Sequence, residues 1–427
     1  MTAFFKTQRG KRFAWYLYDF GNSAYAAVVI LAIYPTFFKN AVVGGPEGTR
    51  LWGLANALAM LVVTVISPML GAIADQLAIK KRLLAAFTAL SCVATAMLYF
   101  VGKGDIFAGF AIFVVAEIAY RTAQIFYNAM LPEIAERANY GRISGHGWAI
   151  GSIGGILCLA LVLPMVVVLG QAAVPWTMVV TAVFFALGSL PLFWFVTERA
   201  LPKPGIAGVS VWKSGFMQIA ATLRKARSFR DYILFLIAFI FLNDAVMIAL
   251  NFAAIIGSVL YGFGQQQLII LIVMVQAANV VGSWVFGFWT DGAGGKSALF
   301  WSGILLAASV VWMIANHDPV MFYPISCLAG FAIAGQQSVS RTMVAKLTPA
   351  AQSAEFFGLF SVAGRTSSVI GPALFGWVAA DLAVANVAAG MEPLAAEQAG
   401  LRAALFIILA FLAAGSVILH FVREDDG

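Results

Sequence analysis

The feature that most constrains this chain is a series of long apolar blocks that recurs along all 427 residues. A helix needs about 20 apolar residues to cross the hydrocarbon core of a bilayer, and each block is about that long. Soluble domains carry about one quarter charged residues. Here the charged share is only 11% and the hydrophobic share is 62%. The sequence therefore predicts an all-α membrane protein with most of its mass in lipid.

Polar or Gly/Pro breaks divide the blocks into twelve predicted transmembrane helices, in two sets of six. Between the sets lies a polar stretch, residues 197–231, which contains prolines and a basic run. We interpret it as a cytoplasmic linker between an N-terminal six-helix bundle, residues 1–196, and a C-terminal six-helix bundle, residues 232–427. The predicted spans lie near residues 13–38, 51–74, 83–101, 106–131, 143–169, 174–196, 232–257, 267–289, 298–316, 320–345, 356–380 and 401–422.

The formal charge of +7 does not indicate a nucleic-acid partner, because the basic residues occupy short spacers and form no continuous patch. A cytoplasmic N-terminus puts 19 of the Lys and Arg residues on that side and 4 on the other. The excess predicts a multi-pass protein with both termini cytoplasmic. We expect the protein to be a monomer in the cell (inner) membrane. Cys92, Cys158 and Cys327 are isolated, so we predict neither a metal site nor a cofactor.

The two sets of spans echo each other at the predicted cytoplasmic ends of their second helices. Each of these helices ends in a GxxxD element followed by basic residues. Repeated halves around a central site are typical of alternating-access transporters. We therefore predict that the two GxxxD elements form a cytoplasmic gate. Arginines near the ends of the tenth and eleventh spans either belong to this gate or form a static tether between helix ends. The predicted gate residues are Gly71, Asp75, Gly287, Asp291, Arg341 and Arg365.

Ionisable side chains inside spans are costly, so each must face protein or a watery cavity. Glu117, Arg121, Gln124 and Asn128 fall on one face of the fourth span. This stripe predicts a cavity wall, and the alternative is a structural ion pair between its first two members. With polar residues of the first, seventh and tenth spans, the predicted substrate or proton cavity contains Asp19, Asn22, Glu117, Arg121, Gln124, Asn128, Asn243, Asp244, Asn251 and Gln337.

The balance of acids and arginines inside the spans favours a zwitterionic or neutral polar solute. Residues 294–297, GGKS, lack the leading glycine and the strand of a phosphate-binding loop, so the energy source is a gradient. We predict that the protein is not an enzyme and that protons are the coupling ion. Uniport or efflux without proton coupling is the first alternative, and a lipid-handling membrane protein on the same fold is the second.

The GxxxD loop after the second span resembles the signature of the major facilitator superfamily. Residues 15–25, WYLYDFGNSAY, together with 127–133, YNAMLPE, and 337–341, QSVSR, resemble its vacuole effluxer branch, whose bacterial members are called the unidentified major facilitator group. The resemblance implies a cavity between two bundles, lined by the first, fourth, seventh and tenth spans, and rocker-switch alternating access. For fungal relatives it implies amino-acid export. The predicted function is thus secondary active transport of a small polar organic solute, such as an amino acid, across the lipid bilayer.

Overall fold

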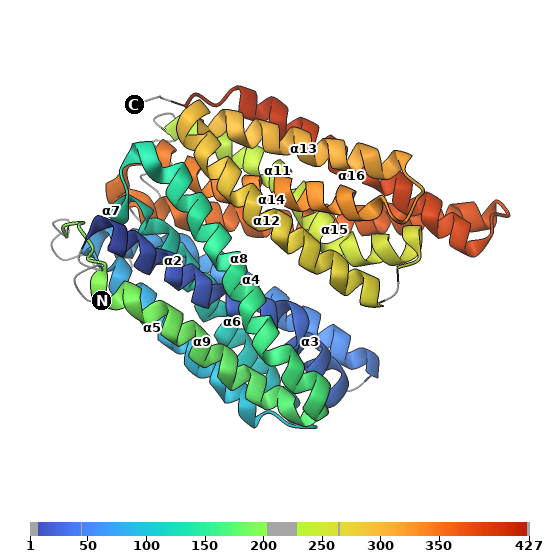
Figure 1. Ribbon diagram of the computed structural model, residues 1–427, viewed down its shortest axis with the longest axis horizontal. Coiled ribbons are helices and arrows are strands. Elements are labelled where there is room, and N and C mark those ends of the chain that lie inside the picture. Colours follow the sequence, from blue (N-terminus) through green and yellow to red (C-terminus); the bar gives the residue numbers. More distant parts are fainter. Residues whose placement is uncertain (1–6, 44, 203–228, 264, 425–427) are drawn as a thin grey trace. The chain divides into compact units, whose positions relative to one another are not determined.

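The computed structural model describes residues 7–43, 45–202, 229–263 and 265–424, and nearly all of them lie in helices (Figure 1). Eleven helical segments of this part of the chain are long and apolar enough to cross a membrane. The 26-residue helix α14 (Phe322–Leu347) is not among them, because its second half carries Gln336, Gln337 and Arg341. At 1.5 Å per residue α14 is still long enough to span. The prediction of an all-α membrane protein is confirmed.

The described chain groups into two compact units, and two helices contribute to both of them. The first few residues of α8 (Tyr140–Leu169) belong to unit 2, and the rest belongs to unit 1. The start of α15 (Ser353–Ala388) belongs to unit 1, and the rest to unit 2. The predicted linker, 197–231, falls mostly outside the described residues. Unit 1 comprises Met1–Arg137, His146–Arg224 and Thr348–Ser361, and unit 2 comprises Ala138–Gly145, Lys225–Leu347 and Val362–Gly427.

Unit 1 begins with α2, whose first turn is capped by Thr7, since the Thr7 hydroxyl accepts a hydrogen bond from the Gly10 amide at 3.1 Å. The first span then passes through a π-helical turn and restarts as α3, with Pro35 in its first turn. Proline lacks an N–H group, so the regular ladder stops there. Figure 1 shows α2, α9 and α5 side by side, and α6 packs on α4 and α5. The helices are α2 (Gln8–Tyr25), α3 (Tyr34–Phe37), α4 (Gly45–Leu77), α5 (Lys80–Met97), α6 (Ile106–Ala129), α7 (Leu131–Ile134) and α9 (Val174–Phe195).

Unit 2 is built on two main helix pairs, in which α11 packs on α16 and α12 packs on α14. Helix α13 contacts both α14 and α16. Helix α11 stops where Gly262 takes a left-handed conformation, with φ of 69°, which glycine adopts without strain. The bounds are α11 (Arg230–Tyr261), α12 (Gln265–Ala293), α13 (Gly295–Ala315) and α16 (Pro393–His420).

The distribution of side chains is that of a membrane protein. Large apolar side chains such as Leu61, Val167 and Trp194 are exposed on helix surfaces. Acids, amides and hydroxyl groups are buried between the helices instead. Because lipid tails accept apolar side chains but not unpaired polar groups, polar function concentrates inside each unit.

Candidate functional site

Glu117 and Arg121 lie one turn apart on α6 and form an ion pair inside unit 1. Nε of Arg121 donates to Oε1 of Glu117 at 2.7 Å. The Glu117 side chain is completely buried, whereas 28% of the Arg121 side chain is exposed. The other carboxylate oxygen, Oε2, is buried and has no hydrogen-bond partner among the described residues. The buried Tyr25 hydroxyl interacts with this carboxylate, so the Glu117 side chain is enclosed by Arg121 and Tyr25.

Aromatic rings frame this ion pair. The ring of Tyr25 stacks on Tyr120 with centroids 4.4 Å apart, and the Arg121 guanidinium lies 5.4 Å from the Tyr120 centroid. Nε2 of Gln124 donates to the Tyr120 hydroxyl at 3.0 Å. Arg121, Gln124 and Asn128 are all half-buried, as expected for one polar face of α6. This face presents a cation, an amide and aromatic rings within a few ångströms of a buried acid.

Asp19 and Asn22 are buried on α2, with 7% and 2% of their surface exposed. Asp19 packs against the backbone of α8. A Cβ atom added to Gly151 would lie 3.0 Å from the Asp19 Cγ atom and 3.0 Å from the Ser23 hydroxyl. Glycine at 151 thus permits the close approach of α8 to the acid-bearing face of α2.

Asp244 occupies the corresponding place in unit 2. Its Oδ1 accepts a hydrogen bond from the Gly371 amide of α15 at 2.7 Å, and only 1% of the residue is exposed. A Cβ atom at Gly371 would also lie 2.7 Å from this oxygen. The sequence predicts that Asp244 faces an aqueous cavity, but in this structure the residue is packed between α11 and α15.

Asn243, beside Asp244, joins two further helices. Its Nδ2 donates to the Ser367 hydroxyl of α15 at 2.5 Å, and its Oδ1 accepts from Nε2 of Gln337 of α14 at 3.1 Å. Asn251, two turns further along α11, is exposed. The structure therefore brings Asn243 and Gln337 into one network.

In unit 1 the GxxxD element holds the start of α15. The Glu355 amide donates to Oδ2 of Asp75 at 2.8 Å. A Cβ atom at Gly71 would lie 2.2 Å from the Ala354 carbonyl oxygen, so only glycine allows this approach. The carboxylate at the N-terminus of α15 also interacts favourably with the helix dipole.

A buried lysine completes this contact, and sequence analysis did not predict it. Nζ of Lys80 lies 3.1 Å from Asp75 and 3.2 Å from Glu133. It also donates to the Ser353 hydroxyl of α15 at 2.8 Å. Lys80 has no exposed surface. Lys80 belongs to the basic residues that follow the GxxxD element, and the sequence alone does not indicate that its side chain turns inward.

Unit 2 contains a similar contact, in which the aspartate of the second GxxxD element binds the start of α8 instead of α15. Asp291, at the end of α12, accepts hydrogen bonds from the amides of Gly141 and Arg142 at 2.8 and 2.9 Å. These amides belong to the first turn of α8. A Cβ atom at Gly287 would lie 3.0 Å from the Gly141 carbonyl oxygen. Both GxxxD elements therefore bind the N-terminal turn of a helix that continues into the other unit.

Arg341 binds the same end of α8 through Ser144. Its Nε donates to the Ser144 hydroxyl at 2.8 Å, and that hydroxyl donates to the Ser338 carbonyl at 2.8 Å. This contact is compatible with both predicted roles of Arg341, the cytoplasmic gate and the static tether. Arg365 is half-buried on α15.

Sequence comparison identifies the family. The chain matches the family described as Vacuole effluxer Atg22 like over residues 52–141 and 135–396, which is more than half of its length. The chain belongs to this family. Within it, the chain is 27% identical over 426 residues to a Bacillus subtilis (strain 168) protein named Uncharacterized MFS-type transporter YxiO, covering 96% of this chain and 94% of that protein. It is 23% identical to Autophagy-related protein 22 of Yarrowia lipolytica, covering 61% of this chain and 49% of that longer protein.

Solved structures share the fold of this Atg22-like chain. The human organic anion transporter MFSD10 superimposes with a TM-score of 0.69 at 14% identity, covering 96% of this chain and 98% of that one. The proton:xylose symporter XylE superimposes with a TM-score of 0.67 at 13% identity, covering 99% of this chain and 97% of that one. The predicted major facilitator fold is thereby confirmed. The protein is a multi-pass MFS-type transporter, and its relatives are transporters rather than enzymes.

The close approach at Gly71 leads to a first testable prediction. We expect Gly71→Ala to lower the apparent Tm in detergent, because its methyl group would collide with the Ala354 backbone, and overpacking typically costs about 1–3 kcal/mol. Gly53→Ala on the same helix is the matched control, since nothing lies within 4 Å of its Cβ position. Equal Tm values for the two variants would contradict the packing account.

Proposed function

We propose that this MFS-type transporter moves a small zwitterionic solute, such as an amino acid, by alternating access coupled to protons. The observation that carries the proposal is the carboxylate of Glu117, which is fully buried beside a partly exposed arginine. A buried carboxylate carries a desolvation cost that protonation removes. Proton loading and ion pairing with Arg121 then become competing states of one acid.

The substrate class follows from the face around this pair. The partly exposed Arg121 offers a cation to a solute carboxylate, and the nearby Glu117 carboxylate offers an anion to an ammonium group. A solute that carries both charges matches this face without leaving a net charge in the membrane. A solute carboxylate would compete with Glu117 for Arg121, which links substrate binding to the proton state of Glu117.

We also propose a gate, a cellular location and a direction for this transport. Asp75, Asp291 and Arg341 each hold the first turn of α8 or α15, and we assign these contacts to a cytoplasmic gate that opens and closes during transport. We place the protein in the cell (inner) membrane as a monomer, with both termini cytoplasmic. The effluxer description of the family supports export as the direction.

The substrate class is tested by thermal unfolding of the purified protein with single solutes. We expect an α-amino acid to raise the apparent Tm, because a ligand at about 100 times its Kd stabilises the folded state by about 2.7 kcal/mol. The methyl ester and the N-acetyl derivative of the same amino acid each lack one charge. They should give no shift at the same concentration.

The double variant Glu117→Gln/Arg121→Gln is the site control for this experiment. It removes both charges together, so it leaves no unpaired ion on α6. We expect it to unfold near the native Tm but to show no shift with the amino acid. Equal shifts from the amino acid and from its ester would contradict a zwitterion site.

A further inference from the structure

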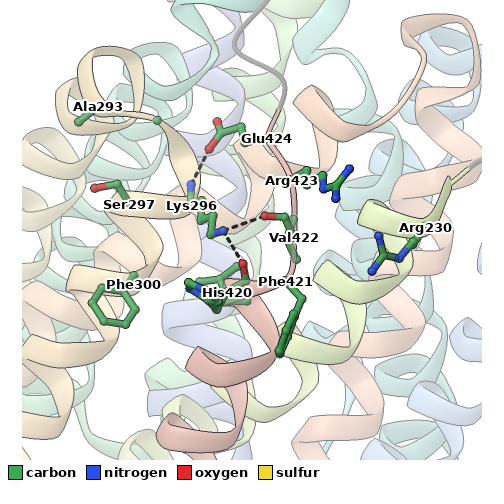
Figure 2. A pocket seen from close by; sticks show the side chains of 12 residues that line it. Arg230, Ala293, Lys296, Ser297, Phe300, His420, Phe421, Val422, Arg423 and Glu424 are labelled. Atoms are coloured by element: carbon green, nitrogen blue, oxygen red, sulfur yellow. Dashed lines mark hydrogen bonds between the residues drawn. The ribbon is translucent and has the colours of Figure 1, made fainter.

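A pocket of about 780 Å³ lies in unit 2, where four helices end together. Its walls come from the first residue of α11, the last residue of α12, the start of α13, and the end of α16 with the tail that follows it (Figure 2). The four helices are among the segments able to cross a membrane, with ends at Arg230, Ala293, Gly295 and His420. A pocket at this level faces the lipid headgroups rather than the hydrocarbon core.

The wall formed by the tail is firmly held. Nζ of Lys296 donates to the carbonyl oxygens of His420 and Val422 at 2.6 and 2.9 Å, as Figure 2 shows. The Glu424 carboxylate accepts from the amides of Gly295 and Lys296 at 2.8 and 2.7 Å. These bonds fix the last described residues against the start of α13, so the pocket is formed before any ligand arrives.

The one acid in the pocket wall is already engaged. Besides the two amides, Glu424 pairs with Lys346 at 3.0 Å. Burial alone would raise the pKa of Glu424, but the Lys296 and Gly295 amides and the Lys346 ammonium together hold this pKa below its ordinary value of 4.5. Because the folded-state pKa of Glu424 is lowered, its contribution to stability is fully present above its ordinary pKa and is lost as the pH falls through the lowered pKa.

The basic side chains of the pocket are not neutralised in this way. Arg230, Lys296 and Arg423 all line it. Among the described residues, no carboxylate forms an ion pair with any of these three side chains. Arg230 and Arg423 are exposed at the pocket surface. The site therefore presents two accessible guanidinium groups to a ligand, while the Lys296 ammonium is held by carbonyl oxygens and the Arg423 amide donates to Asp231 at 2.9 Å.

Aromatic rings stand beside these cations. Phe300 and Phe421 line the pocket, with 39% and 59% of their surface exposed, and Trp301 next to Phe300 is also 46% exposed. Exposed aromatic rings at helix ends are typical of the membrane interface. A ligand that fits both features has an anionic headgroup for the arginines and an apolar part for the rings.

We propose that this pocket binds the phosphate group of an anionic membrane phospholipid. Arginine pairs with phosphate through parallel charge-assisted hydrogen bonds, and basic pockets between transmembrane helices suit acidic headgroups. A soluble phosphate ester shares the headgroup chemistry but makes no use of Phe300 and Phe421. The inference is independent of the substrate proposed above, because it concerns other residues of unit 2.

The test is lipid binding to the delipidated protein, measured by native mass spectrometry with phosphatidylglycerol and, separately, with phosphatidylethanolamine of the same acyl chains. We expect phosphatidylglycerol to bind at least tenfold more tightly. Arg230→Gln/Arg423→Gln should reduce its affinity at least tenfold. The control Arg82→Gln/Arg137→Gln removes the same charge from exposed arginines near the ends of other helices and should change it less than twofold.

Three outcomes would overturn the proposal. Equal affinity for the two lipids would show that binding does not require an anionic headgroup. An equal loss of affinity in the control variant would show that the net positive charge of the protein, and not this pocket, explains binding. Glycerol phosphate that binds as tightly as phosphatidylglycerol would assign the pocket to a soluble ligand. If the glutamine variant does not fold, Arg230→Lys/Arg423→Lys replaces it, and its charge-retaining side chains should keep the preference for phosphatidylglycerol.

Discussion

Replacing Lys80 by Met is expected to be among the most destabilising single changes in unit 1, at about 3–5 kcal/mol. The side chain has no exposed surface and forms ion pairs with both Asp75 and Glu133. Its removal leaves two buried carboxylates facing each other without a cation. It also removes the hydrogen bond to Ser353 that holds the start of α15. Thermal and urea unfolding in detergent measure the loss.

Lys81→Met is the matched control for this prediction. Lys81 is half-buried, and its contact with Glu198 is made by the backbone amide at 3.1 Å, which the substitution keeps. We expect a change within about 0.5 kcal/mol. Adding Asp75→Asn and Glu133→Gln to Lys80→Met should recover part of the lost stability, because no charge then stays unpaired. No recovery in the triple variant would contradict the ion-pair explanation.

Replacing Glu117 by Gln is expected to reduce solute flux at least tenfold in proteoliposomes. The change removes the only acid in contact with Arg121 among the described ion pairs, and with it the group that we assign to proton binding. Flux should lose its response to a pH gradient at the same time. The measurement is release of a preloaded amino acid, with protein content and orientation matched to the native preparation.

A static ion pair would give a different pattern. If Glu117 only neutralises Arg121, the double variant Glu117→Gln/Arg121→Gln should restore flux, because both charges are gone. If the pair acts in transport, the double variant should stay inactive while unfolding near the native Tm. Restored flux in the double variant would therefore contradict our assignment.

Much of the fold was accessible from the sequence because membrane spans are signalled locally. A run of apolar residues predicts each span. Helical spacing alone places the polar residues from Glu117 to Asn128 on one face. The ion pair within that stripe joins residues only one turn apart. The family was visible in short motifs such as residues 15–25 and 337–341.

The partners of the other polar residues were beyond the sequence, because they come from distant helices. Asp75 bonds to an amide 280 residues away, and Asp244 to one 127 residues away. No local pattern specifies that Asp244 accepts a hydrogen bond from the Gly371 amide. Nor does a local pattern specify that the Lys80 side chain turns inward, whereas Lys296, at the same place in the repeat, binds carbonyl groups. These contacts depend on how helices pack, and glycines at 71, 151 and 371 reveal the packing only once the helices are placed.

The central claim, proton-coupled transport of a zwitterion, is tested most directly by flux of the native protein under an imposed pH gradient. Proteoliposomes are loaded with the amino acid that raises the Tm and diluted into medium that is either more acidic than, or equal in pH to, the interior. Protein-free vesicles and the Glu117→Gln variant run in parallel. We expect the acidic exterior to accelerate release from native vesicles, because protons entering the vesicle drive the solute out. Equal release in both media, above the protein-free rate, would contradict proton coupling and define a uniporter.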